Sequence, residues 1–343
     1  MTENSPLVCV CVPAYNSEAT IAESLSSILD QTYANLIVMM VDNASTDATV
    51  KIAEKIAEKD RRLRIIRNPV NLGGEGNFTC CINLAGGEYT AIYHADDVYD
   101  PEIIEREVRF LEEHKEAGAV FCAARDIDET GRVIAARKLP SEGGIAKGGV
   151  FDFQQVFRTA LKMGNFMVFP SAMVRTRVYK DEIKAWDPEH FSTSADLDVW
   201  LRIAERHPLG FINIPLMKYR VSASSYSYNF ARLKTTRHAI FLVLDFYLKK
   251  YSGSFIGQSE MTDYRLLLLK DDINIAINLL IKGERACARR LLAPALKPEN
   301  IRNSLRSRGQ TRILAIGLAA WVLSLVPLGA QGRNFLARVR HNG

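Results

Sequence analysis

The sequence predicts an α/β fold in which helices cover both faces of a parallel sheet, followed by a helical appendage. Through the first half of the chain, apolar runs of strand length alternate with amphipathic helical patterns. Beyond Asn229 only long helical patterns follow. The 343 residues are 48% hydrophobic and 24% charged, an ordinary globular composition with enough chain for more than one domain.

The expected strands and helices alternate from the N-terminus. Residues 7–12 form a β-branched run that Pro13 is expected to end, and Ser17 is the expected N-cap of a helix over 17–30. The further expected strands are residues 36–41, 63–66, 89–93 and 120–123. The further expected helices are residues 46–58, 76–85, 101–114 and 151–162. A glycine-rich stretch, 143–150, is expected to be a mobile connection.

The strand over 89–93 ends in two adjacent carboxylates, Asp96 and Asp97. Ligands of open α/β sheets bind at the carboxyl ends of the strands, so we expect these side chains at a binding site. Neighbouring carboxylates are costly without a cation, and hard oxygen ligands suit Mg²⁺ or Mn²⁺. The alternative is that Asp97 and Asp100 only cap the helix that starts at Pro101.

The loops after the first three strands should open onto the same edge of the sheet. Tyr15 could stack on a base, Asp42 or Asn43 could bind a pyrimidine edge, and the glycine-rich turn over 68–77 would let the backbone approach a sugar or phosphate. Alternatively, Tyr15 covers the rim, a hydroxyl caps a helix and the glycines make a turn. The candidate residues for a bound nucleotide are Pro13, Tyr15, Asn16, Asp42, Asn43, Gly73 and Asn77.

Several classes of protein are disfavoured by missing patterns. No G-x-G-x-x-G follows the first strand and no G-x-x-x-x-G-K-[ST] occurs, which disfavours dinucleotide oxidoreductases and P-loop NTPases. The six cysteines show no C-x-x-C spacing and lie mostly in apolar runs, and no secretory signal is apparent, so reduced cytoplasmic thiols are expected.

Four segments together resemble family 2 of the inverting glycosyltransferases: VPAYNSEATIAESLSSILDQTY, VDNASTDAT, NPVNLGGEGNF and the aspartate pair, within residues 7 to about 225. The resemblance implies a GT-A type nucleotide-sugar-binding sheet flanked by helices, in which a D-x-D element holds a divalent metal on the donor diphosphate. It places the metal ligand on Asp96 and makes Asp97 a candidate contact to the donor. His94 stands where the motif usually has its first aspartate, which implies a water-mediated or weakened contact there.

Two later segments also resemble the family. Residues 194–202 resemble its E-D-x-D-x-W-L-R helix, so that Asp196 matches the catalytic base while Ala195 replaces the usual glutamate. An N-terminal cap is the alternative role for Asp196. Residues 218–222 resemble the segment that closes over the diphosphate, which makes Arg220 a candidate for phosphate binding, with an ordinary surface arginine as the alternative; Ser222 receives no role.

The function implied is inverting transfer of a sugar from a nucleotide-sugar donor, UDP- or dTDP-linked, to a hydroxyl of a glycan or lipid-linked saccharide, as in surface polysaccharide assembly. The expected cofactor is Mg²⁺ or Mn²⁺, and no nucleic-acid partner is expected. An inactive nucleotide-sugar-binding module and a nucleotidyltransferase are the alternatives. A processive synthase is disfavoured because no Q-x-x-R-W occurs.

The C-terminal part carries a separate expectation. We expect a catalytic domain over 1–228, a helical appendage over 229–300 with helices at 231–251, 261–281 and 284–292, and a basic tail over 301–343. The tail holds seven Lys plus Arg and no Asp or Glu. The chain before it therefore has 37 basic and 39 acidic residues and is nearly neutral. Its uncharged segment, 313–330, could span a membrane, lie in its interface or join the core. Arginines on both sides favour a segment that dips into the inner face of the cytoplasmic membrane.

Overall fold

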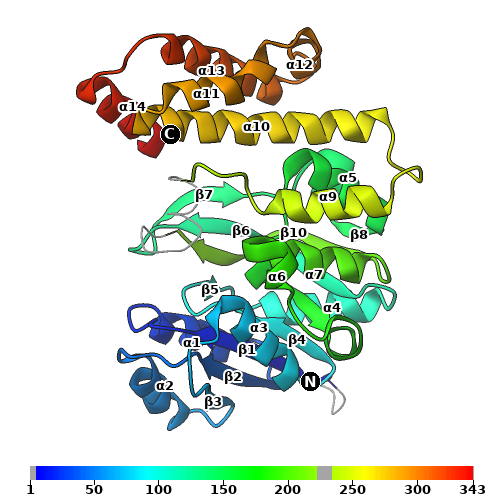
Figure 1. Ribbon diagram of the computed structural model, residues 1–343. Coiled ribbons are helices and arrows are strands. Elements are labelled where there is room, and N and C mark those ends of the chain that lie inside the picture. Colours follow the sequence, from blue (N-terminus) through cyan, green and yellow to red (C-terminus); the bar gives the residue numbers. More distant parts are fainter. Residues whose placement is uncertain (1–4, 222–233, 343) are drawn as a thin grey trace. The chain divides into compact units, whose positions relative to one another are not determined.

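A computed structural model describes residues 5–221 and 234–342 and divides the chain into two units (Figure 1). The first unit comprises Met1–Thr159 and Asn165–Val221, and the second comprises Ala160–Gly164 and Ser222–Gly343. Ser222 and the start of the expected helix over 231–251 therefore lie outside the described residues.

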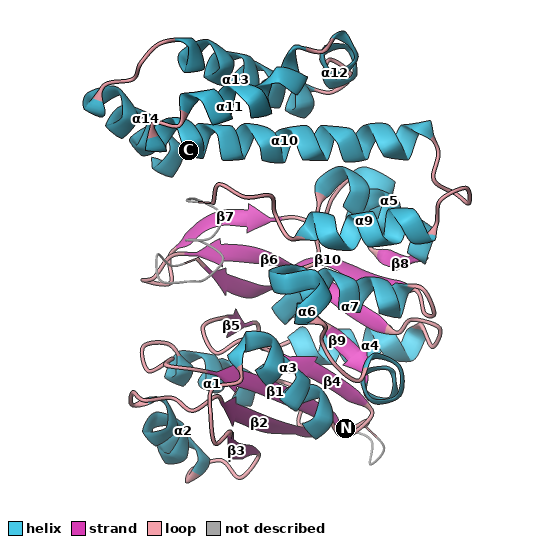
Figure 2. Ribbon diagram, viewed as in Figure 1, coloured by secondary structure: helices cyan, strands magenta, loops and turns pink. Residues whose placement is uncertain are grey.

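The first unit is built on one 10-stranded sheet with the order β3-β2-β1-β4-β9-β6-β10-β5, in which β7 pairs with β6 and β8 with β10 (Figure 2). The pairs β1–β2, β2–β3 and β1–β4 are parallel, and so is the pair β6–β10. The other pairings are antiparallel, so the sheet is mixed and not purely parallel as predicted. The strands are β1 (Val8–Ala14), β2 (Leu36–Asp42), β3 (Leu63–Arg67), β4 (Tyr89–Ile92), β5 (Val98–Tyr99), β6 (Ala119–Ile127), β7 (Val133–Arg137), β8 (Gly149–Phe151), β9 (Met173–Arg175) and β10 (Leu209–Arg220).

Helices cover both faces of this sheet. Alternate residues of β1, among them Val8 and Val10, join a buried cluster with Ile21 and Leu25 of α1 and Ile104 of α4. Cys11 points to the other face, where its thiol lies 3.6 Å from the carbonyl oxygen of Cys81 in α3. The helices up to β10 are α1 (Ile21–Leu29), α2 (Thr49–Ala57), α3 (Gly73–Leu84), α4 (Ile103–Glu113), α5 (Phe153–Met163), α6 (Pro188–Phe191) and α7 (Ala195–Ala204).

Local boundaries differ from the sequence predictions where the chain makes turns. Strand β1 continues through Pro13 to Ala14, because the ladder to β4 ends at Cys11 and the missing N–H of Pro13 costs no ladder bond. Ser17 does not cap α1 through its side chain, since its carbonyl oxygen accepts from Thr20 and Ile21 in a turn before the helix. The glycine-rich stretch expected to be a mobile connection contains a 3₁₀ turn, Glu142–Lys147, and strand β8.

The second unit is helical and has its own core. The helices in its described residues are α9 (Ile240–Lys250), α10 (Gln258–Lys282), α11 (Arg285–Leu292), α12 (Pro298–Ser304), α13 (Arg308–Leu325) and α14 (Ala330–Asn342). In α13, Leu314 and Ala320 are buried in one cluster with Ile273 of α10 and Leu292 of α11. None of the described helices is long and apolar enough to cross a membrane. Through Leu314 and Ala320, residues 313–330 contribute one face to a protein core, which was the alternative to the predicted membrane-dipping segment.

Candidate functional site

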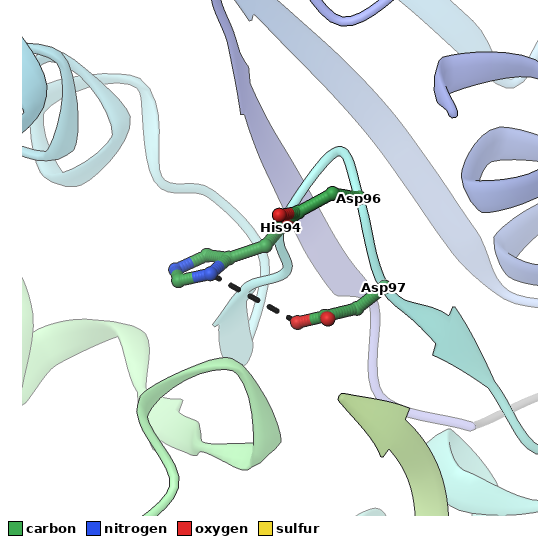
Figure 3. A group of neighbouring side chains, drawn as sticks. All are labelled: His94, Asp96 and Asp97. Carbon is green, nitrogen blue, oxygen red and sulfur yellow. Dashed lines mark ion pairs between the residues drawn. The ribbon is translucent and has the colours of Figure 1, made fainter. Parts of the chain in front are cut away.

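The candidate site is centred on the loop between β4 and β5, at the carboxyl end of β4. His94, Asp96 and Asp97 each offer a ligand atom here, and the three atoms lie within 4.8 Å of one another. Figure 3 shows the Asp97 carboxylate facing the imidazole, with Oδ2 lying 3.9 Å from Nδ1 of His94. The sequence-predicted pair is thus joined by His94, which the sequence marked only as a departure from the motif.

Helix α1 holds this loop through four polar side chains, Thr20, Ser24, Ser27 and Gln31. They are spaced three or four residues apart and therefore lie on one side of the helix and of the turns at its ends. Thr20 Oγ1 donates to the carbonyl oxygen of Ala95 at 2.9 Å, and Ser24 Oγ donates to that of His94 at 2.9 Å. Ser27 Oγ accepts from the backbone N–H of Tyr99 at 3.1 Å. Gln31 Nε2 donates to the carbonyl oxygen of Asp100 at 2.8 Å. The loop conformation is therefore tied to a rigid helix at four points.

Arg220, at the end of β10, braces the same loop from the other side. Its side chain is 5% exposed, and Nε donates to the carbonyl oxygen of Asp96 at 2.8 Å. Nη2 pairs with Oε2 of Glu23 at 2.5 Å, and Nη1 donates to the carbonyl oxygens of Asp128 and Glu129. The guanidinium is buried and already engaged by the chain, so the predicted phosphate contact of Arg220 would require it to give up some of these partners.

Asp97 is buried and does not cap a helix. Its Oδ1 accepts from the backbone N–H of Arg220 at 2.8 Å. Asp100 accepts from the N–H of Glu102 in the turn before α4, but the N-cap of α4 is Glu102 and it has no side-chain cap bond. Burial, and then the charge of Asp96, raise the pKa of Asp97 well above its ordinary value, and burial lowers the pKa of His94.

One oxygen of this cluster, Asp97 Oδ2, is buried without a hydrogen bond among the described residues. His94 Nε2 also lacks one, but it lies on the far side of the ring from Nδ1, the nitrogen that faces Asp97. Unpartnered buried polar atoms are costly, and a carboxylate-rich set with one imidazole is a donor set that suits Mg²⁺ or, especially, Mn²⁺. The residues present therefore fit a divalent cation.

The loops after β2 and β3 form an asparagine network. Asn43 donates to Oδ1 of Asn71 and to the carbonyl oxygen of Gly73, and its own Oδ1 accepts from Asn68 and from the N–H of Leu72. Asn77 donates to the carbonyl oxygen of Val41 at 3.0 Å and accepts from Asn68 at 2.9 Å. Because their amide groups are engaged, Asn43 and Asn77 hold the loops together in this structure.

The other rim residues are arranged differently. Tyr15 is 47% exposed, and Asn16 accepts from the N–H of Thr46 at 2.9 Å. Asp42 is fully buried, accepts from the N–H of Ser45 and lies 3.6 Å from Nε of Arg67. Beside it lies a pocket of about 420 Å³, lined by Ala44, Ser45, Arg67, Asn68 and Pro69. A planar group entering this pocket would meet polar atoms from two loops and the charge of Arg67.

Asp196 lies in the first turn of α7 and is held by a residue that the sequence did not single out. Asn165 Nδ2 donates to its Oδ2 at 2.7 Å. Burial raises the pKa of Asp196 to about 6, against the lowering effects of the Leu197 backbone and of Asn165. The N-cap of α7 is Ser194, so Asp196 is not the cap.

An aromatic cluster connects α7 with the loop over residues 93–97 between β4 and β5, called the acidic loop below. The His94 ring stacks on Phe78 of α3 with centroids 5.9 Å apart, and Phe169 meets His94 edge-on at 4.9 Å. Phe169 also packs on Trp200 of α7 at 5.6 Å. His94 thus lies in one packed cluster with the helix that carries Asp196.

The contacts that sequence reasoning missed join segments far apart in the chain. Asn165 precedes Asp196 by 31 residues and Glu23 precedes Arg220 by 197. No local pattern distinguishes Asn165 from other loop asparagines. The serine and threonine spacing along residues 20–27 was a usable signal, since those residues lie on one side of the predicted helix.

Curated relatives of this chain are glycosyltransferases. The putative glycosyltransferase EpsE of Bacillus subtilis is 33% identical over 225 residues, which cover 65% of this chain and 75% of that protein. A glucosyltransferase of Escherichia coli, WfaP, is 36% identical over 109 residues, 32% of this chain and 43% of that protein. Its name gives UDP-Glc as the donor and α-D-GlcNAc-diphosphoundecaprenol as the acceptor.

Solved structures share the fold. S. aureus TarS 1–349 in complex with UDP-GlcNAc aligns with a TM-score of 0.54 at 18% identity, over 92% of this chain and 90% of that one. The mannosyltransferase PcManGT from Pyrobaculum calidifontis, in complex with GDP-Man and Mn²⁺, aligns with a TM-score of 0.53 at 20% identity, over 94% and 88%. The fold is thus that of GT-A glycosyltransferases. The model of the family named Glycosyl transferase family 2 matches residues 9–181, and this chain belongs to that family.

Proposed function

We propose that this glycosyltransferase transfers a sugar from a nucleotide-sugar donor to a hydroxyl of a glycan or lipid-linked saccharide, with inversion and with a divalent metal. The observation that carries the proposal is the pairing of two sites within one unit. The acidic loop holds His94, Asp96 and Asp97 within 4.8 Å, and α7 presents Asp196 with a pKa of about 6.

The metal would be held by Asp96, with Asp97 Oδ2 and His94 as the further ligands that the loop offers. When bound, Mg²⁺ or Mn²⁺ supplies positive charge to the diphosphate as it departs. The loop contributes rigidity: α1 and Arg220 fix the backbone of residues 94–100, so that little reorganisation is needed when the donor binds.

Asp196 is the proposed general base. A carboxylate with a pKa near 6 is ionised at neutral pH, yet is basic enough to take a proton from an acceptor hydroxyl while the new bond forms. Asn165 holds its Oδ2 and is a positioning residue. One base and a departing diphosphate suffice for a single displacement, and this gives inversion at the sugar carbon.

The donor is proposed to be UDP- or dTDP-linked. The pocket beside Asp42 and Ser45 would take the base, Tyr15 would stack on it, and Pro13, Asn16, Asn43, Gly73 and Asn77 would shape the loops around it. UDP-GlcNAc in TarS and the UDP-Glc named for WfaP support a pyrimidine donor, and the GDP-Man of PcManGT shows that related folds accept other bases.

The acceptor is proposed to lie at the cytoplasmic face of a membrane. The lipid diphosphate acceptor in the name of WfaP supports this assignment, and surface polysaccharide assembly is the process it suits. We propose that residues 1–228 form the catalytic domain and that 229–300 form the helical appendage. The tail over 301–343 packs into the core of that appendage through α13 and is proposed to serve the membrane side.

The function is tested by sugar release from labelled UDP- and dTDP-sugars, with Mn²⁺ and with a chelator. We expect release that requires the metal, and loss of both release and Mn²⁺-dependent donor binding in Asp96→Ala. Glu102→Ala, which removes an exposed carboxylate just beyond the same loop, is the matched control and should behave like the wild type. Binding of the donor without turnover under any acceptor would favour an inactive binding module, and normal turnover in Asp96→Ala would refute the metal assignment.

A further inference from the structure

The outward face of α13 is unusual for a helix that borders water. Between residues 313 and 330 every exposed residue is apolar: Ala315, Ile316, Ala319, Val322, Leu325, Val326, Pro327, Gly329 and Ala330. The only hydroxyl in this stretch, that of Ser324, points inward and donates to the carbonyl oxygen of Trp321 at 2.6 Å. Surface helices normally place polar residues outside, so this pattern is the reverse of the usual one.

The two faces of α13 are clearly separated by helical spacing. Leu314, Gly317 and Ala320 lie on the buried side. Ala315, Ala319 and Val322 lie on the opposite side, and Val322 is 58% exposed. Ile316, which is 43% exposed, lies at the border, one turn before buried Ala320. The inner face accounts for the folding role of the helix, and it leaves the outer apolar face unexplained. A continuous apolar surface on a folded protein marks a binding site.

Charge identifies the kind of partner. Arg308 and Arg312 begin the exposed side of α13, exposed Arg302 and Arg306 precede them, and exposed Arg338 follows in α14. The last acidic residue of the sequence is Glu299, which pairs with Arg265. This surface is apolar in the middle, has arginines before and after it and contains no acidic residue. Such a surface suits a lipid bilayer, because the apolar side chains can contact acyl chains while the arginines bind anionic headgroups.

A second copy of the chain fits this face less well. In a symmetric dimer the two α13 helices would lie along each other, and arginines at both ends would meet arginines in either direction. We propose that the outer face of α13 docks on an anionic lipid bilayer, lying in its interface. This docking proposal rests on the proposed function, because a lipid-linked acceptor would place the enzyme at a bilayer.

The test is vesicle sedimentation of the full chain, with phosphatidylcholine alone and with added phosphatidylglycerol. We expect binding that is stronger on the anionic vesicles and weakened by salt. Val322→Asp should weaken it by roughly tenfold or more, because a charge would enter the apolar interface. Arg308→Glu with Arg312→Glu should remove most of the preference for anionic vesicles, a loss of about tenfold or more. Ile134→Asp, at a 54% exposed apolar position in β7, is the matched control and should bind like the wild type.

Each outcome decides the proposal separately from catalysis. Helical circular dichroism and donor hydrolysis in the absence of lipid should be the same for Val322→Asp and the wild type, which separates docking from folding and from chemistry. No vesicle binding by the wild type, or equal binding by Val322→Asp, would overturn the proposal. So would a wild-type dimer in gel filtration that Val322→Asp dissociates, since this face would then be covered by a second copy. Failure of sugar transfer alone would leave the binding result unaffected.

Discussion

The carboxylate of Asp196 combines two properties that an ordinary surface aspartate lacks: it is largely removed from water although the residue is partly exposed, and it accepts from the Asn165 amide and from the Leu197 backbone. Burial raises its pKa to about 6, whereas the ordinary value, which applies to the unfolded chain, is 3.8. The ionised form therefore costs folding free energy, and this cost accumulates as the pH rises from 3.8 to about 6. Each pKa unit corresponds to about 1.4 kcal/mol.

Asp196→Asn should separate the base from a structural role. We expect turnover to fall by on the order of a hundredfold or more while donor affinity is kept, because the shape remains and only basicity is lost. The melting temperature at neutral pH should stay the same or rise, since a buried charge is removed. Turnover and melting temperature are measured on the same protein. A lower melting temperature with normal turnover would instead assign Asp196 a structural role.

The pH profile should reveal the contact with Asn165. In the wild type, kcat/KM should fall as the pH decreases through about 6, because protonated Asp196 cannot accept a proton. The Asn165 amide favours the ionised form, so Asn165→Ala should move the acidic limb to higher pH. Asn334→Ala, an exposed asparagine in α14, is the control. An acidic limb that stays in place in Asn165→Ala would show that this bond does not tune the base.

At the scale of elements, α1 acts as the frame of the acidic loop. Ser24→Ala removes the donor to the His94 carbonyl oxygen, and one such bond contributes about 1 kcal/mol. We therefore expect roughly fivefold weaker activation by Mn²⁺, seen as a higher metal concentration for half-maximal sugar release. Ser26→Ala, exposed on the same helix, should leave this concentration unchanged. Equal metal dependence in both variants would mean that the loop keeps its shape without α1.

The elements also show what a sequence can predict. Strands β1, β2 and β4 and helix α4 were predicted because their apolar spacing is local, whereas α7 was predicted from the family resemblance. The mixed sheet was not predicted, because β9 lies antiparallel between β4 and β6 and that pairing depends on residues distant in sequence. At the site the aspartates were predicted from motifs, whereas the partners of Arg220 come from three other segments. Residues that make only long-range contacts leave no periodic signal.

At the scale of the whole molecule, the proposed chemistry lies in one unit and the proposed membrane contact in the other. His94, Asp96, Asp97, Asn165 and Asp196 all belong to the first unit, and α13 belongs to the second. Deleting the chain from Thr311 onward would remove Leu314 and Ala320 from the second core. Such a deletion would expose that core, so point substitutions are the sharper way to test each unit.

Gly317→Val tests whether the second core can be disturbed without losing the chemistry. A Cβ at Gly317 would lie 2.6 Å from Cδ1 of Ile273, so a larger side chain overpacks this core and should destabilise the helical unit by about 1–3 kcal/mol. Gly309→Val, on the same helix with nothing near the added Cβ, is the matched control. Calorimetry should show a lower melting transition for Gly317→Val alone, while hydrolysis of the labelled donor stays close to that of the wild type. Parallel loss of hydrolysis and of the helical unit would show that the acidic loop and Asp196 need the second core to hold their geometry.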